Sequence, residues 1–76
     1  MNTISDVMIH INESLSKEAR SSLENAMRKV EGVVSPGFQE DKQHLLVIAY
    51  NPEKTSTAVL LEKARTEGYT AQLVGM

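Results

Sequence analysis

Two histidines, a methionine and a few carboxylates are the side chains in this sequence best suited to hold a metal ion. His10 and His44 supply imidazole, which suits Cu(II), Zn(II) or Ni(II), and Glu13 and Glu18 follow the first histidine closely. Met8 adds a thioether beside His10. The chain has no cysteine, which excludes a disulfide, a thiolate nucleophile and a thiolate metal site. A metal site would therefore need these few side chains to converge.

The polar segment 12–16 is the second place where chemistry could occur. Ser14 and Ser16 fit helix caps, whose hydroxyl oxygens accept the free backbone N–H groups of a helix start. In the alternative, the capped helix start binds a small anion or a partner's carboxylate, although Glu13 and Glu18 would oppose an anion. No serine and histidine come with a third group to orient them, so we expect no enzymatic activity.

Composition narrows the classes of partner. The 76 residues carry 8 Lys+Arg against 10 Asp+Glu, a net charge of -2, which gives no basic footprint for nucleic acid or for an anionic membrane. Neither a secretory signal nor a membrane span is expected from the sequence. A domain of this size buries about 60% of its unfolded surface, so we expect one core in a single cytoplasmic domain over 1–76.

Hydrophobic periodicity predicts six elements along the chain. Each helix is followed by a glycine, Gly32 or Gly68, that can end it. Ser14 or Ser16 can cap the first helix, and Thr55 or Ser56 the second. The predicted elements are a strand over 6–11, a helix over 16–31, strands over 33–39 and 44–50, a helix from about 57 to 67, and a strand over 69–74.

This order, βαββαβ, predicts an α+β, ferredoxin-like sandwich with a four-stranded antiparallel sheet and two helices on one face. The first and third strands should be central. Pro36 cannot donate to a strand ladder, so the second strand should lie at an edge. The first turn, the hairpin at 40–43 and the corner at 68–69 should meet at one end of the sandwich. The other face of the sheet should be open.

The chain resembles the heavy-metal-associated domain family, which includes small copper chaperones and the N-terminal domains of copper-transporting ATPases. The similarity covers nearly the whole chain and depends on an ordered set of short motifs. These are Ile9-x-Ile11, then Leu23-x-x-Ala26-Met27-x-x-Val30-x-Gly32-Val33, Ile48-x-Tyr50-Asn51-Pro52, Leu60-x-x-x-Ala64 and Gly68-Tyr69-x-Ala71.

The departure from the family pattern falls on its metal site. The family carries a Met-x-Cys-x-x-Cys run between the first strand and the first helix. Counted back from Gly32, the methionine position falls on Ser14 and the cysteine positions on Ser16 and Ala19. A serine hydroxyl is a poor ligand for soft Cu(I), and alanine offers none. The resemblance therefore implies the fold without the thiolate route of metal transfer.

The resemblance also implies where other candidate residues lie. Tyr69 would lie under the first loop, so it joins Glu13, Ser14, Ser16 and Glu18 as a candidate loop site. The family register directs His44 inward and His10 out of the open face. Residues on opposite faces cannot share one ion, so we expect two unconnected histidines.

The open sheet face carries an unusual set of outward residues. On a sheet with one wet face, outward positions should be polar. Here the central strands would present a contiguous apolar patch with one titratable residue, and such patches often mark binding surfaces. The candidate interaction face consists of Met8, His10, Leu45, Val47 and Ala49. The competing interpretation is a strand that tolerates some exposed aliphatic side chains.

The sequence thus predicts a non-enzymatic domain that lacks the thiolate site and acts as a protein-interaction or regulatory module through its open face. A protein partner or a homodimer would use that face, and no cofactor, nucleic acid or membrane is expected. The alternative is a protein that binds or transports Cu or Zn through non-cysteine ligands near the first loop. A small-ligand sensor is a third hypothesis, for which no ligand loop is recognisable.

Overall fold

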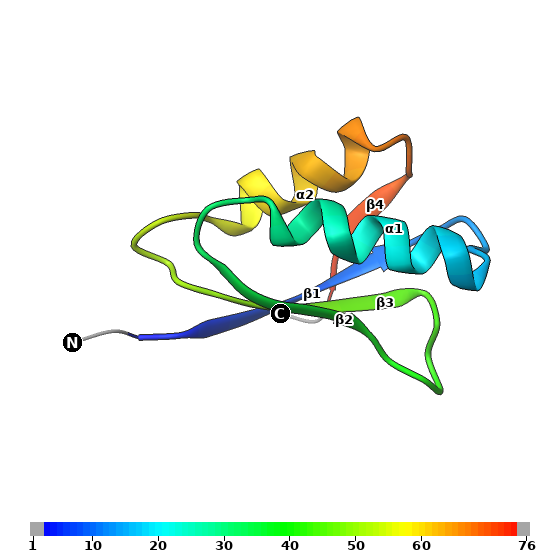
Figure 1. Ribbon diagram of the computed structural model, residues 1–76, viewed down its shortest axis with the longest axis horizontal. Coiled ribbons are helices and arrows are strands. Elements are labelled where there is room, and N and C mark those ends of the chain that lie inside the picture. The colour runs from blue at the N-terminus through cyan, green and yellow to red at the C-terminus, as the bar shows by residue number, and fades with distance from the viewer. Residues whose placement is uncertain (1–2, 75–76) are drawn as a thin grey trace.

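The computed structural model describes residues 3–74 (Figure 1). This part of the chain forms four strands and two helices, and the last strand is the shortest. The predicted single domain over 1–76 therefore includes residues 1–2 and 75–76, which lie outside the described part. The elements are β1 (Ser5–Ile11), α1 (Lys17–Arg28), β2 (Val33–Phe38), β3 (Leu45–Tyr50), α2 (Thr57–Thr66) and β4 (Ala71–Leu73). The βαββαβ order is as predicted.

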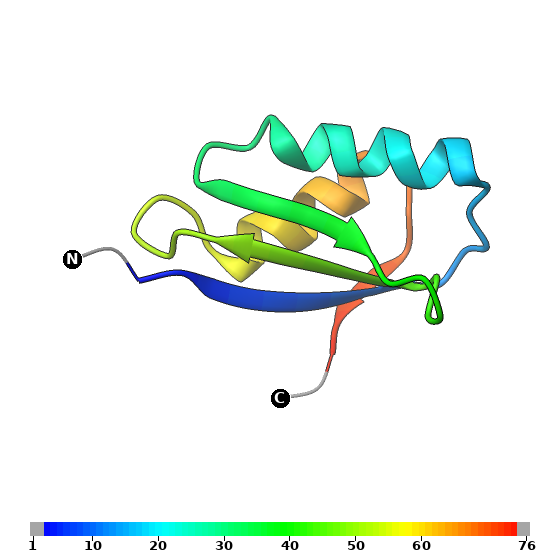
Figure 2. The same ribbon diagram turned by 60° about the horizontal axis from the view of Figure 1, so that its bottom comes forward.

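The four strands form one antiparallel sheet in the order β2-β3-β1-β4, with both helices packed on the same face (Figures 1 and 2). The prediction that the first and third strands are central is confirmed. The register of β1 on β3 pairs Ile9 with Leu46 and Met8 with Val47. Because side chains alternate along a strand, Ile9 and Leu46 face the helices while Met8 and Val47 face the other side.

The core lies between the sheet and the helices. β3 buries every second residue, β1 buries Ile9 and Ile11, and α1 buries Leu23 and Met27 one turn apart. α2 contributes Leu60 and Ala64 at the same spacing. The buried hydrophobic residues are Ile9, Ile11, Leu23, Met27, Leu46, Ile48, Tyr50, Leu60, Ala64 and Ala71. This single cluster fixes the register of the sheet, because a shift by one residue would expose it.

Both helices begin at a serine cap. Ser16 Oγ accepts the backbone N–H of Ala19 at 3.1 Å, and Ser56 Oγ accepts that of Val59 at 3.3 Å. Of the two predicted caps for each helix, the structure uses the later one. α1 ends three residues before the predicted limit, and Gly32 and Gly68 follow the helices with φ of 98° and 101°.

The strand with the proline lies at the sheet edge, as predicted. Pro36 pairs with Ile48 in β3, and the ladder shifts register between Val33 and Ser35. α1 supplies a further tie to this edge, because Glu24 Oε2 accepts the backbone N–H of Phe38 at 2.9 Å. A helix carboxylate thus satisfies a donor that an edge strand would otherwise leave open.

β4 is shorter than the predicted strand over 69–74. Tyr69 and Thr70 lie in the turn after α2, where the N–H of Tyr69 donates to the carbonyl of Ala64 at 3.3 Å. Their backbone groups are used by the turn and by the first loop, so the ladder begins only at Ala71.

Candidate functional site: the open sheet face and the first loop

The open sheet face presents the predicted patch as one surface across the two central strands. Asp6, Met8 and His10 of β1 lie opposite Ala49, Val47 and Leu45 of β3, respectively. Directly opposed residues of an antiparallel pair project to the same side. The predicted set of Met8, His10, Leu45, Val47 and Ala49 is therefore contiguous. Met8 is 39% exposed, and the other four are half-buried by their neighbours.

The centre of this face is apolar, and its two ends are polar. Gly37 of β2 lies opposite Val47, so no side chain screens the valine from the edge. Asp6 lies at one end of the β1 row and His10 at the other. A hollow of about 210 Å³ adjoins Met8, but its lining includes Val7 and Tyr50, which face the helices, so it lies beside the sheet and not on the open face. The apolar centre of the open face itself could contact a partner protein.

The prediction that His10 and His44 lie on opposite faces is wrong. Their rings stack, with centroids 5.6 Å apart and planes inclined by 15°. His44 precedes β3, and its backbone carbonyl accepts the N–H of Ile11 at 2.8 Å. Its ring Nδ1 lies 2.7 Å from the Ile11 carbonyl oxygen. This side-chain bond to the backbone, outside the regular strand, sets the ring's direction in place of strand alternation.

The first loop is tied to the far end of the chain by Glu13. The Glu13 carboxylate accepts the backbone N–H of Thr70 through both oxygens, at 2.9 and 3.1 Å. The Asn12 N–H donates to the Thr70 carbonyl at 2.9 Å beside it. The hydrogen bond from Thr70 lowers the pKa of Glu13 below its usual value. The first turn and the 68–69 corner therefore meet, as predicted.

The remaining candidate loop residues are placed around this tie. Ser16 caps α1, and Glu18 lies in the first turn of that helix, where its charge suits the helix dipole. Ser14 is exposed and lines a shallow hollow with Leu15, Glu40, Asp41, Gln43 and His44. Tyr69 is half-buried against the core. Glu13 and Ser16 thus already have structural partners, while the side chains of Ser14 and Glu18 form no hydrogen bond within residues 3–74.

The positions that match the family's cysteines do not fit Cu(I). Ser16 Oγ is occupied by the N–H of Ala19, and Ala19 carries only a methyl group. Neither atom is a soft donor. Within the described range, no group of three or more histidine, aspartate or glutamate side chains could hold a metal ion.

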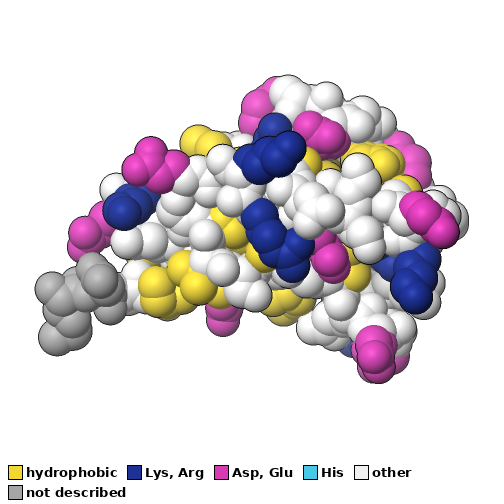
Figure 3. Space-filling model, viewed as in Figure 1, with side chains coloured by type: hydrophobic (Ala, Val, Ile, Leu, Met, Phe, Trp, Pro, Cys, Tyr) yellow, Lys and Arg dark blue, Asp and Glu magenta, His cyan; other side chains and the backbone are white. Residues whose placement is uncertain are grey.

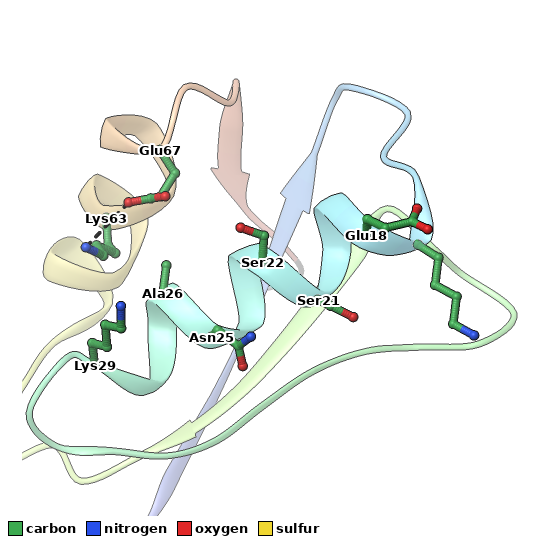
Figure 4. A pocket seen from close by; sticks show the side chains of 9 residues that line it. Glu18, Ser21, Ser22, Asn25, Ala26, Lys29, Lys63 and Glu67 are labelled. Atoms are coloured by element: carbon green, nitrogen blue, oxygen red, sulfur yellow. Dashed lines mark ion pairs between the residues drawn. The ribbon is translucent and has the colours of Figure 1, made fainter.

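A polar groove of about 670 Å³ lies between the two helices, on the opposite side of the molecule from the open sheet face (Figure 4). Ser22 and Asn25 of α1 line it with Lys29, the residue after that helix. Lys63 of α2 lies across from them and pairs at 3.5 Å with Glu67, just beyond the end of α2. Charged side chains of both signs are interspersed over the view of Figure 3. The groove lacks the convergent buried polar groups typical of a ligand site. No helix among residues 3–74 is long and apolar enough to cross a membrane.

No protein-family model matches the sequence, and no curated protein matches it. Solved structures do. MerP from Ralstonia metallidurans CH34 has a TM-score of 0.82 at 20% identity, covering 93% of this chain and 97% of its own. The copper-binding domain of HMA7, a P-type ATPase, has a TM-score of 0.83 at 16% identity, and the match covers 99% of this chain and 96% of that domain. The N-terminal domain of a potential copper-translocating P-type ATPase from Bacillus subtilis, in the Cu(I)-loaded state, has a TM-score of 0.83 at 21% identity. The match covers 93% of this chain and 88% of that domain.

These likenesses show a common fold. The chain has the ferredoxin-like fold of heavy-metal-associated domains, as its motifs predict, and it contains no cysteine. The sequence identities are too low to transfer a function.

Proposed function

We propose that the chain is a non-enzymatic interaction module, and that a second copy of the chain binds to the open sheet face. The observation that carries this proposal is the contiguous patch of Met8, Leu45, Val47 and Ala49 on a face that no helix of the described fold covers. A flat apolar sheet face in water gains free energy when it is covered, at about 25 cal/mol per Å² buried. The patch favours association over catalysis.

The arrangement of polar residues on the face suits a twofold dimer. Asp6 and His10 stand at opposite ends of the β1 row, with Met8 midway between them. A twofold axis that crosses β1 at Met8 would place Asp6 of each copy over His10 of the other. It would also bring the two Met8–Val47 centres together, and one surface would serve both subunits. The face thus pairs its apolar centre and its two polar ends with those of a second copy.

Binding of Cu or Zn around the first loop is the alternative function. Its candidate ligands are Glu13, Ser14, Ser16, Glu18 and Tyr69. Glu13 and Ser16 hold backbone N–H groups at Thr70 and Ala19, and metal binding would break one or both of these bonds. The contacts of this loop therefore favour a structural role for it.

Sedimentation velocity over a range of concentrations tests the dimer. The wild-type chain should shift from monomer to dimer as concentration rises. Val47→Lys places a charge at the centre of the face and should leave a monomer at every concentration. Val59→Lys is the matched control, because Val59 is an exposed valine of α2 on the other side of the sheet.

The control should dimerise like the wild type. A wild-type chain that stays monomeric at millimolar concentration would overturn the proposal. Equal loss of dimer in the two lysine variants would also overturn it, since the effect would then not belong to the open face. Circular dichroism should first show that both variants are folded.

A further inference from the structure

The stacked pair of His10 and His44 is a second feature of this end of the sheet. We propose that the two rings hold one transition-metal ion through their Nε2 atoms, with Cu(II) bound most tightly. This site differs from the family's cysteine positions, which fall on Ser16 and Ala19, and it does not depend on dimer formation. The orientation of the two rings, their separation and the chemistry of imidazole support such a site.

Ring orientation leaves the same nitrogen free on both histidines. The Ile11 carbonyl oxygen can only accept, so His44 Nδ1, at 2.7 Å, must be the donor. His10 Nδ1 lies 3.0 Å from Asn12 Oδ1, which also accepts. A neutral imidazole with hydrogen on Nδ1 has its lone pair on Nε2. No hydrogen bond involves either Nε2 within residues 3–74.

The oxygen partners are those that orient metal ligands. A ligating histidine generally donates its second ring N–H to a carbonyl or carboxylate oxygen, which fixes the tautomer and raises the basicity of the ligating nitrogen. Here Ile11 and Asn12 supply both oxygens from adjacent positions on one stretch of chain. Since both Nδ1 edges are directed to that stretch, both Nε2 edges are directed away from it.

The ring separation suits one shared ion. A metal–nitrogen bond is about 2.0–2.1 Å, and an imidazole centre lies about 1.1 Å beyond the nitrogen, so two such ligands have centroids about 4.5–6.4 Å apart. The observed 5.6 Å lies within that range. Because the stacked rings are only 15° from parallel, their Nε2 lone pairs converge only after one ring turns. The His10 ring, bonded to a side-chain oxygen of Asn12 that can move with it, would turn, while His44 keeps its bond to the Ile11 carbonyl and the strands stay in place.

Ligand chemistry selects the ion. Two imidazoles without a thiolate favour borderline divalent ions over Cu(I), and Cu(II) heads the affinity order among them. Water would fill the remaining positions, because no third histidine or carboxylate joins the pair within the described part. The ion would then be held in an open and exchangeable site.

Titration of the untagged protein with Cu(II), followed by calorimetry and electron paramagnetic resonance of ¹⁵N-labelled chain, tests the site. We expect one ion per chain with two ring nitrogens coordinated, and weaker binding of Ni(II) and Zn(II). His10→Ala and His44→Ala should each lose more affinity than Asn12→Ala, which should lose about tenfold by releasing the His10 ring.

His44→Asn guards against misfolding, because its amide can still donate to the Ile11 carbonyl while it lacks Nε2. It should fold and bind as weakly as His44→Ala. Coordination by fewer than two ring nitrogens would overturn the proposal, as would unchanged affinity in either histidine variant. One ion per two chains would also contradict it, since the ion would then lie between subunits.

Discussion

The carboxylate of Glu13 and the backbone amide of Thr70 are 57 positions apart in sequence and are joined by hydrogen bonds of 2.9 and 3.1 Å. This contact closes the end of the sandwich where the first loop meets the turn after α2. Because the amide stabilises the charged carboxylate, the pKa of Glu13 lies below its ordinary value of 4.5. The contact therefore makes stability depend on pH.

A lowered folded-state pKa sets the sign of that dependence. The contribution of Glu13 is present above its unfolded pKa of about 4.5 and is lost as pH falls through the lower folded value. Glu13→Gln should remove it, so the gap in urea midpoint between wild type and variant should narrow as pH falls below 4.5. Glu53→Gln is the control and should follow the wild-type profile. A gap that widens in acid would contradict this assignment.

Gly32 lies in the turn between α1 and β2 and packs against the loop after β3. Its φ is 98°, and an added Cβ would come within 2.8 Å of Lys54 Cβ and 3.1 Å of Thr55 Cγ2. Gly68 has a similar φ of 101° but no atom within 4 Å of the added Cβ. Gly68→Ala should therefore cost about 1–2 kcal/mol of unfolding free energy, for the backbone alone.

Gly32→Ala should cost more than Gly68→Ala, because the loop at Lys54 must also move. The difference between the two variants in urea denaturation measures the close approach of this loop. Equal costs would show that the loop yields freely. The Asn51 N–H, which donates to the Gly32 carbonyl at 2.7 Å, should exchange faster with solvent in the Gly32 variant.

The Glu24–Phe38 contact predicts a further effect on stability. Removing the carboxylate in Glu24→Ala leaves the Phe38 N–H of the edge strand without its acceptor, at a cost of about 1–2 kcal/mol. Asn25→Ala, at an exposed position of the same helix, is the control and should cost less. Hydrogen exchange of the Phe38 amide should accelerate in the Glu24 variant only. Unchanged exchange would show that the contact is not formed in solution.

The polar residues at the two ends of the open face, Asp6 and His10, predict the orientation of the dimer. Asp6→Lys should weaken dimerisation a few-fold, because an exposed pair contributes about 0.2–1 kcal/mol. Asp6→Lys combined with His10→Asp exchanges the two ends and should restore part of the loss. Asp41→Lys, on the hairpin outside the face, should have no effect. Failure of the double variant to recover would indicate a different axis.

Much of this architecture could be predicted from residue types alone. Gly32, Gly68 and the serine caps delimit the helices, and Pro36 assigns its strand to an edge, because each acts through its own backbone chemistry. Met8 and Val47 alternate with buried neighbours along their strands, and this alternation correctly predicted that both lie on the open side of the sheet. The His10–His44 pair was missed because strand parity was extended to His44. That residue precedes β3, and its ring bond to Ile11 decides its direction.

The most direct test of the interaction face is a dilution series of ¹H–¹⁵N correlation spectra of the wild-type chain, from dilute to millimolar concentration. The proposed dimer predicts shift changes that rise with concentration and cluster at Asp6, Met8, His10, Leu45 and Val47, with the helix amides unchanged. Spectra that do not change with concentration, or changes centred on α1 and α2, would contradict an open sheet face that binds its own copy.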